Sequence, residues 1–553
     1  MRRFVALGAL SLAACSSAAT PRPTVAAPAE ARLDLGPPVT WSGQITYESR
    51  SPTPHGASLA VTPRPARFVE LRAVGPAGVS LGQSRTDAEG RYVLTAPSRA
   101  AIEVVARLAD QTVQLSVTGD ADGVTPHSFR VPTVPPAGGA LDVRLPDDPA
   151  GVAGAFHILD TVLRGLDAAH RWSGVTLPPL SVYWGRGVTT EWSFYRGERP
   201  AGSGRYVLEL LGGRRNRTTE DDCDEHDEGI ILHEVGHFVM DMLSSNSSTG
   251  GSHPSGYLVD PGLAWEEGRA TWFSAAVRGA PDYQDTIGRE PQGSLRVNHD
   301  LEGRGRPPRG IGSEDSVANV LWDLSDGVEG QPDTDHDGIA LGPEAVLRAM
   351  MADRNDPAAF PSLGSFLRRI SEPAAGGAQP LVARAALLAM LDATGEPATL
   401  VPTQDADDWP TNLAAPGVTT GKIDGLTNPA PSGGPARAEN GFDAVRMYRV
   451  HATERGWLFV ELNISGMGSR RDRSDLDLEL RDHRAEVLSS SRGTAPRETV
   501  GRLVEPGYYY VYVRDGGGGN RANFELRTRF RPIPTTPSAA PAPSAAPAPA
   551  ATP

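Results

Sequence analysis

The stretch DEGIILHEVGHFVMD, residues 227 to 241, contains the pattern His-Glu-x-x-His, with His233 and His237 four positions apart. On a helix, residues i and i+4 lie on the same face, so both imidazoles can reach one ion. Zinc binds neutral imidazole nitrogens at about 2.0–2.1 Å. Glu234 lies beside the first histidine, where it is suited to act as a general base on a water at the ion. The stretch therefore predicts a helix that presents a Zn²⁺ site.

Gly236 lies inside this predicted helix. A glycine in a helix interior costs about 1 kcal/mol relative to alanine. The residue therefore suggests that another part of the backbone packs closely against the helix at this position.

A catalytic zinc site needs a third protein ligand. The residues after His237 are Phe-Val-Met-Asp-Met-Leu, which excludes the HExxHxxGxxH extension of the metzincins. The downstream stretch WEEGRATWF, residues 265 to 273, resembles the E-G-x-A element that carries the third zinc ligand in many gluzincins. This resemblance implies a zinc metallopeptidase with Glu267 as third ligand and Glu234 as catalytic base. Glu266 is the alternative ligand, and an ordinary exposed helix glutamate is the alternative interpretation of Glu267.

The match to the gluzincin pattern is incomplete. The thermolysin-like pattern places an Asp four residues after the ligand glutamate to orient a histidine, and Thr271 stands there in this chain. Asp241, one helical turn beyond His237, is our candidate for that supporting role, with a solvated carboxylate at the helix end as the alternative. Cys223 is interpreted as a free thiol. The candidates for the group that stabilises the oxyanion are Tyr257, His253, Tyr283 and His299.

A second metal motif lies in the stretch DTDHDGIALGPE, residues 333 to 344. Its carboxylates fall at positions 1, 3, 5 and 12 of an EF-hand loop, and Gly338 falls at position 6, where the sharp turn is needed. No second loop pairs with it, so we expect a structural Ca²⁺ rather than a sensor; a solvated acidic turn is the alternative. The predicted calcium ligands are Asp333, Asp335, Asp337, the carbonyl of Ile339, and Glu344.

The segments on either side of residues 150–400 consist of short strand patterns separated by turn residues. In residues 38–146, TDAEGRY (86–92) resembles the turn-and-strand signature of carboxypeptidase-regulatory, transthyretin-like domains. In residues 404–531, LDLEL (476–480) and EPGYYYVYV (505–513) resemble the pre-peptidase C-terminal domain. The predicted fold is therefore multidomain, with an α+β zincin-like catalytic domain flanked by two all-β sandwich domains.

The N-terminus has the pattern of an export signal. Two arginines precede the apolar stretch FVALGALSLAA, and LAAC (12–15) resembles a bacterial lipobox. This resemblance implies a signal peptide over 1–15, lipid on Cys15, and attachment to a bilayer of the bacterial cell envelope; a plain secretory signal is the alternative. Ser16 in the following position favours the outer membrane. Residues 16–37 are expected to be a flexible tether, and the Pro/Ala-rich residues 532–553 a disordered tail.

Charge and composition narrow the class of partner. The 553 residues contain 67 acidic and 53 basic side chains, and no block of lysine and arginine. Nucleic acid is therefore not an expected partner. The favoured function is an exported, lipid-anchored zinc peptidase that acts on a protein or peptide. The alternative is a non-enzymatic, calcium-stabilised binding or adhesion protein of the cell surface, with an inactive zincin-like core.

Overall fold

A computed structural model gives the structure of the chain. The residues that it describes are 34–108, 113–148, 151–189, 191–197, 204–214, 217, 220–246, 248, 250, 253, 256–303, 307–329, 333–334, 336–354, 361–373, 377, 379–401, 410–424, 442–465, 475–483, 485–516 and 521–533. The signal segment 1–15 with Cys15, and residues 534–553 of the predicted tail, lie outside these ranges. Within the described part of the chain, no helix is both long enough and apolar enough to cross a membrane.

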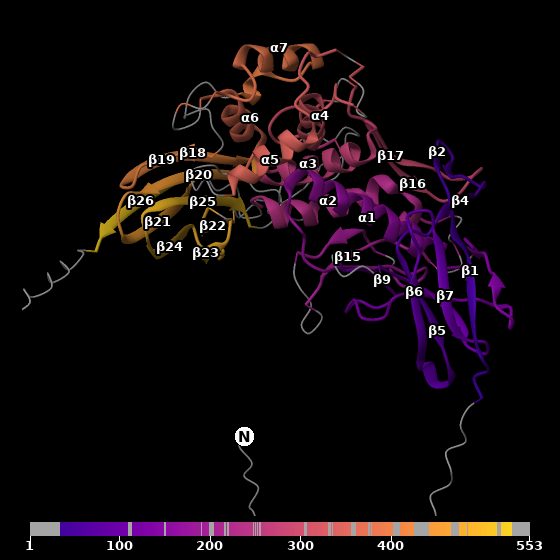
Figure 1. Cartoon of the computed structure of the whole chain (residues 1–553). Coiled ribbons are helices and arrows are strands. Elements are labelled where there is room, and N and C mark those ends of the chain that lie inside the picture. Colours follow the sequence, from indigo (N-terminus) through magenta and orange to yellow (C-terminus); the bar gives the residue numbers. More distant parts are fainter. Residues whose placement is uncertain are drawn as a thin grey trace, which may run out of the picture.

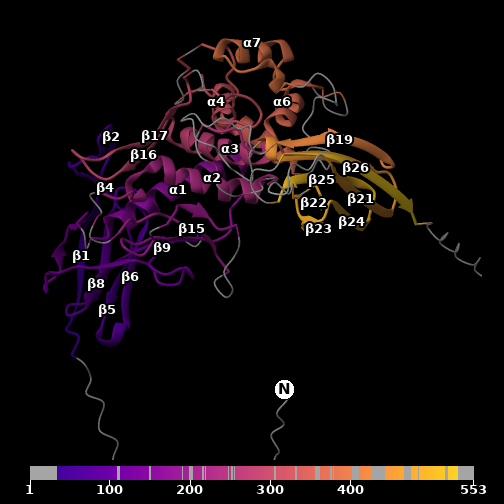
Figure 2. The same cartoon turned by 180° about the vertical axis from the view of Figure 1, so that it is seen from behind.

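Two β-sheets build the N-terminal part of the molecule (Figures 1 and 2). The smaller sheet is organised around β1, which pairs with four other strands. The larger one has the order β14-β15-β13-β9-β8-β5-β6, with β10 beside β8. Alternating side chains of β1 and β7 are buried between the sheets, as the period of two in their sequences predicts. The strands are β1 (Pro38–Ser49), β2 (Pro52–Thr53), β3 (Gly56–Ala57), β4 (Thr62–Pro65), β5 (Val69–Val74), β6 (Ser80–Arg85), β7 (Arg91–Pro97), β8 (Ala101–Leu108), β9 (Leu115–Thr118), β10 (Ser128–Arg130), β11 (Gly139–Ala140), β12 (Val143–Leu145), β13 (Leu180–Tyr183), β14 (Phe194–Tyr195) and β15 (Tyr206–Glu209).

The larger sheet crosses the domain boundary that the sequence suggests near residue 146. Strand β9, predicted within the N-terminal sandwich, lies parallel to β13 of the following segment, and β13 lies parallel to β15. One continuous hydrophobic core extends from Trp41 to Val401. The N-terminal strands and the helical part therefore form one packed body, because their side chains share a sheet and a core.

Helices cover this sheet and form the middle of the molecule (Figure 1). Asp260 caps α3 by accepting hydrogen bonds from the backbone N–H groups of Gly262 (2.9 Å) and Leu263 (3.1 Å). A hairpin of β16 (Asp282–Ile287) and β17 (Ser294–Asp300) follows α3. The helices are α1 (Ala153–Ser173), α2 (Glu228–Leu243), α3 (Pro261–Arg278), α4 (Glu314–Ser325), α5 (Pro343–Asp353), α6 (Leu363–Ser371) and α7 (Arg384–Thr394).

The C-terminal part is a β-sandwich with its own core. Its sheets have the orders β18-β20-β25-β22-β23 and β19-β26-β21-β24. A separate cluster of Val445, Met447, Tyr510 and Tyr512 lies outside that core. The backbone N–H of Phe442 donates to the carbonyl of Leu258 (3.1 Å), which attaches this sandwich just before α3. The strands are β18 (Thr411–Asn412), β19 (Gly417–Asp424), β20 (Val445–Ala452), β21 (Gly456–Ser465), β22 (Leu476–Arg481), β23 (Val487–Ser491), β24 (Arg497–Val504), β25 (Gly507–Asp515) and β26 (Arg521–Pro532).

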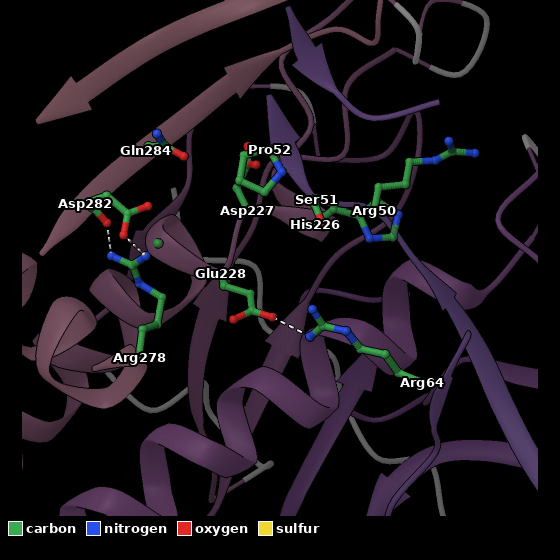
Figure 3. A pocket seen from close by; sticks show the side chains of 11 residues that line it. Arg50, Ser51, Pro52, Arg64, His226, Asp227, Glu228, Arg278, Asp282 and Gln284 are labelled. Atoms are coloured by element: carbon green, nitrogen blue, oxygen red, sulfur yellow. Dashed lines mark hydrogen bonds and ion pairs between the residues drawn. The ribbon is translucent and has the colours of Figure 1, made fainter. Parts of the chain in front are cut away.

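A cavity of about 160 Å³ lies where the N-terminal strands meet the start of α2. Arg64 reaches Glu228 of α2 (2.5 Å) at this cavity, and Arg278 contacts Asp282 (3.4 Å), as Figure 3 shows. None of the predicted zinc ligands lines it. The cavity therefore marks the junction between the two segments rather than the predicted catalytic site.

A buried ion network holds this junction together. Asp147 is 5 % exposed and contacts Arg50 (2.5 Å), Arg289 (3.1 Å) and Arg186. Burial disfavours the charged carboxylate, but the contact with His226 and the arginine charges hold the pKa of Asp147 well below its usual range. Removing one partner of such a network leaves the others buried and uncompensated, which is strongly destabilising.

We predict that Asp147→Asn lowers the free energy of unfolding by about 3 kcal/mol at pH 7. Because the folded-state pKa of Asp147 is lowered, its contribution is present above about pH 4 and is lost as the pH falls further. Denaturant unfolding at pH 7 and pH 3 measures this, and the difference between variant and wild type should shrink at pH 3. Asp148→Asn, at an exposed neighbour, is the control. An equal loss at both pH values would contradict the charge-based explanation.

Candidate metal centre

Helices α2 and α3 pack in close contact at one point. A Cβ added to Gly236 would lie 2.9 Å from the Cα of Ala270, which is closer than real Cβ contacts. On the opposite side of α3, a Cβ on Gly268 would lie 2.4 Å from the Cβ of Val317 in α4. The packing inferred from Gly236 is thus confirmed, and it brings the residues one turn before Ala270 to the histidines of α2.

His233, His237 and Glu267 meet at this contact between the helices. The two Nε2 atoms are 3.0 Å apart, and each lies 3.2 Å from Oε2 of Glu267. Ligands at about 2.05 Å from a tetrahedral zinc are about 3.3 Å apart, so these separations fit three corners of a zinc site. All three ligand atoms lie within 4.8 Å of one another. The three residues could therefore hold a metal ion without rearrangement.

Further side chains orient the two imidazoles. Nδ1 of His233 is 3.0 Å from the hydroxyl of Thr271, which can accept its proton and leave Nε2 free as a ligand. Nδ1 of His237 is 3.7 Å from Glu266, whose other oxygen accepts from Arg269. Glu266 thus lies behind His237, whereas Oε2 of Glu267 faces the Nε2 atoms of both histidines.

Arg269 anchors this arrangement to the end of α2. Its guanidinium is 1 % exposed and donates to the hydroxyl of Ser244 (2.5 Å) and to the carbonyl of Ser245 (3.0 Å). Neither Arg269 nor the role of Thr271 was predicted from the sequence. Arg269 and Thr271 lie two and four residues after Glu267 in the same helix. Thr271 therefore shares the helix face of Glu267, and this spacing was the sequence signal that could have identified them.

Glu234 lies at the same site but is not part of the ligand set. Its side chain is buried, and it accepts a hydrogen bond from the backbone N–H of Tyr195 in β14. Burial raises the pKa of Glu234, although the neighbouring histidines oppose the shift. Its Oε2 has no hydrogen-bond partner among the described residues. A buried carboxylate oxygen without a donor is suited to accept a proton from a water or substrate group.

Asp241 does not contact His237. Its carboxylate accepts a hydrogen bond from the Tyr195 hydroxyl at 2.7 Å. The same tyrosine thus bonds Glu234 through its backbone and Asp241 through its side chain. Asp241 therefore helps to place the strand β14 beside Glu234, while Thr271 and Glu266 take the histidine-orienting positions.

His253 and Tyr283, both candidates for an oxyanion-stabilising group, lie at the site. His253 is 3.4 Å from Oε1 of Glu267 and 3.2 Å from Glu314. Burial lowers the pKa of His253, but the bond to Glu314 and the two carboxylate charges raise it to about 9. The ring of Tyr283 lies 5.7 Å from that of His233. His299 instead bonds Asn319 (2.7 Å).

The predicted calcium loop contains the expected turn at Gly338, and its predicted acidic ligands other than Asp335 can be located. Gly338 has φ +88°, and Asp337 accepts a hydrogen bond from the N–H of Ile339 (2.8 Å). Asp335 lies outside the described residues. The side chain of Glu344 is 57 % exposed and pairs with Arg348 (3.0 Å), so it is not directed at the loop as expected.

Asp326, at the end of α4, is an acidic neighbour of this loop that the sequence analysis missed. It is 1 % exposed. Burial and the carboxylates of Glu302, Asp337 and Asp333 raise the pKa of Asp326 to about 9. It lies outside the twelve-residue motif, so the loop pattern gave no signal for it.

Comparison with known proteins relates the central segment to peptidases. Residues 185–359 match the family model of the mycolysin C-terminal domain. The match covers 175 of the 553 residues and includes His233, Glu234, His237 and Glu267. This segment is therefore related to a metallopeptidase family. No curated protein matches the chain at a significant level.

Solved structures give partial similarities with low TM-scores. The pre-peptidase C-terminal domain of collagenase from Bacillus anthracis is 11 % identical, with a TM-score of 0.15, and covers 21 % of this chain and 92 % of that chain. PliG, a periplasmic inhibitor of g-type lysozyme from Aeromonas hydrophila, is 12 % identical, with a TM-score of 0.14 and coverages of 22 % and 97 %. Such TM-scores do not establish a shared fold.

We predict that Thr271→Val weakens Zn²⁺ binding by about 10-fold, because an acceptor for a ligand histidine is lost while the side-chain shape is kept. Competition with a chromogenic chelator measures the dissociation constant. Thr271→Ser keeps the hydroxyl and should bind as wild type does. Equal affinities for the valine and serine variants would show that Thr271 does not orient His233.

Proposed function

We propose that this chain is a zinc-dependent peptidase of the gluzincin type. The convergence of His233, His237 and Glu267 at separations that fit one zinc ion carries the proposal. The buried, donor-free oxygen of Glu234 beside this set provides the base that peptide hydrolysis needs. The match of this segment to the mycolysin C-terminal domain supports the same reaction class.

Zn²⁺ held by these residues would supply a Lewis acid and lower the pKa of a coordinated water to about 7. Glu234 accepts the proton of the attacking water and returns it to the leaving amine. The N–H of Tyr195 holds one end of the Glu234 carboxylate, which keeps the other end directed into the site. Thr271 fixes the tautomer of His233, and Glu266 with Arg269 holds His237.

The surroundings of β14 favour a protein or peptide as substrate. This strand is the last one in its sheet, and its Tyr195 contacts Glu234. The nearby side chains of Trp192 and Phe194 are exposed. An extended peptide segment can add to the edge of a sheet and place alternate side chains against apolar groups. We infer that substrate lies along this edge.

Export and calcium binding complete the proposal. Lipidation at Cys15 would attach the peptidase to the cell envelope, with the outer membrane as the favoured location. Asp333, Asp337 and the Ile339 carbonyl, with Asp335, would hold Ca²⁺ in the loop, and the buried Asp326 replaces Glu344 as the additional acidic group. Calcium would then clip the end of α4 to the start of α5.

The alternative is a surface-binding protein with an inactive core. A lipid anchor, a calcium loop and two β-rich flanks are consistent with either function. The position of Glu234 favours the enzyme, because a buried carboxylate oxygen without a donor destabilises a fold and has no use in an inert scaffold.

We predict that Glu234→Gln lowers kcat for hydrolysis of a denatured protein at least 100-fold, because general-base catalysis contributes about 10²–10⁴-fold. Zn²⁺ content, measured by elemental analysis, should stay at the wild-type level. The control Glu220→Gln changes an exposed carboxylate and should keep full activity.

The peptidase proposal fails if zinc-loaded wild type cleaves neither denatured protein nor any member of a broad peptide library. The assignment of Glu234 as the base fails if Glu234→Gln retains full activity, because the base would then be another group.

A further inference from the structure

A second group of carboxylates lies beside the metal centre, and its residues have no part in the proposed catalysis. Asp222 and Asp224 precede α2, and Asp285 lies on β16. One oxygen from each of the three lies within 4.8 Å of the other two. Calcium binds oxygen at about 2.3–2.6 Å, so ligands on opposite sides of the ion are about 4.6–5.2 Å apart. The three oxygens are therefore close enough to share one Ca²⁺.

The backbone fixes these carboxylates from two directions. Asp222 forms an isolated antiparallel bridge with Ile287. The register of β16 shifts between Asp285 and Thr286, and both residues are buried. Thr286 uses its N–H (3.0 Å) and its hydroxyl to bind Asp227. Asp285 is therefore held next to the loop that leads into α2, but its side chain takes no part in the contact between Thr286 and Asp227.

Asp285 is buried without the partners that a carboxylate needs. It is 6 % exposed, and its Oδ1 accepts no hydrogen bond from any described residue. Its other oxygen is 3.9 Å from Nε of Arg296, which is too far for a hydrogen bond. Oδ1 of Asp222 also has no hydrogen-bond partner in the described part of the chain. Two of the three carboxylates thus each have one donor-free oxygen.

Acidic side chains outnumber basic ones at this cluster, and Asp222 and Asp224 share a side-chain hydrogen bond. Asp224 accepts from the hydroxyl of Ser193, which is neutral. Arg296 pairs with Asp222 (2.5 Å), and its side chain is 43 % exposed. Burial and the charge of Asp222 raise the pKa of Asp285 to about 7. Among the described residues, the half-exposed Arg296 is a weak counter-charge for the buried Asp224 and Asp285 and the partly buried Asp222.

Another buried acidic group in the chain is different. Asp147, Glu225 and His226 also bring possible ligand atoms together. However, Arg50, Arg186 and Arg289 contact Asp147, so that group already has its positive charge. Three arginines thus contact Asp147, whereas Arg296 is the arginine that pairs with Asp222 near Asp285.

We propose that Asp222, Asp224 and Asp285 form a Ca²⁺ site that joins the loop before α2 to the hairpin strand β16. All three ligands are carboxylates, which suit a hard cation such as Ca²⁺ rather than zinc. The site is distinct from the loop at residues 333–344. It stabilises the start of the helix that carries His233 and the strand whose Tyr283 ring lies against His233.

The test uses the full chain loaded with one equivalent of Zn²⁺, in an Asp337→Asn background that disables the loop at 333–344. Calorimetric titration with Ca²⁺ should show one bound ion, and thermal unfolding should show a rise in Tm of several degrees. Adding Asp285→Asn should abolish both effects. Asp282→Asn, three residues earlier on the same strand and half-buried, is the matched control and should change neither.

Trp192 provides a second readout that does not require a change in the cluster. Its ring lies 5.8 Å from the guanidinium of Arg296, which in turn contacts Asp222. Tb³⁺ bound at the site should show tryptophan-sensitised emission that Ca²⁺ displaces. Trp192→Phe should lower this emission while Ca²⁺ binding stays unchanged.

The proposal is overturned if the Asp337→Asn protein binds no Ca²⁺, or if adding Asp285→Asn leaves the Ca²⁺ stoichiometry unchanged. If Asp285→Asn does not fold, unchanged Tb³⁺ emission in Trp192→Phe overturns it. Tighter binding of Mg²⁺ or Zn²⁺ than of Ca²⁺ at this site would also contradict it. None of these outcomes depends on peptide hydrolysis, so the peptidase proposal can fail while this one holds.

Discussion

The close packing of α2 against α3 at Gly236 determines the arrangement of the whole candidate centre. Gly236 faces Ala270, and a single added Cβ would lie 2.9 Å from the Ala270 backbone. His233 and His237 lie three residues before and one residue after that glycine. Glu267 and Thr271 have the same offsets from Ala270. The contact therefore places the two histidines of one helix opposite Glu267, the proposed third ligand, and the Thr271 hydroxyl of the other helix.

Buried negative charge is the second feature that shapes the candidate centre. Glu234, Glu266 and Glu267 are all buried around the two histidines, and Arg269 neutralises only the outer part of this group. The carboxylates consequently raise the pKa of His237 well above its usual range despite burial, so positive charge is favoured at the imidazoles. Where arginines supply that charge, as around Asp147, the network needs no ion. Where they do not, as around Asp285, a cation would stabilise the fold.

Much of the central helical part follows from local sequence patterns. The His-Glu-x-x-His spacing identified one helix face, and the E-G-x-A element identified Glu267 in a helix where its contact with the histidines is now seen. The start of α3 also has a local signal, because Asp260 caps the helix and Pro261 begins it. Both signals were present in the sequence and have a known mechanism.

Other features depend on contacts between distant segments, which periodicity does not encode. Asp241 has the correct spacing to support His237 but bonds Tyr195, which comes from a different strand. Glu344 completes the loop motif in sequence, yet its exposed side chain pairs with Arg348 one turn later. Strand β9 has a pattern that fits either sheet, and its parallel pairing with β13 decides between them. The roles of Arg269 and Asp326 likewise follow from packing alone.

The central claim is that two histidines and Glu267 hold one zinc ion. X-ray absorption at the zinc edge of the zinc-loaded protein tests this directly, because it reports the type and distance of the atoms bound to the metal. We predict two imidazole nitrogens and oxygen ligands at about 2.0–2.2 Å, and the loss of one imidazole contribution in His237→Ala. A sulfur ligand at about 2.3 Å, which would indicate Cys223, or a shell of oxygen atoms without imidazole would contradict the account.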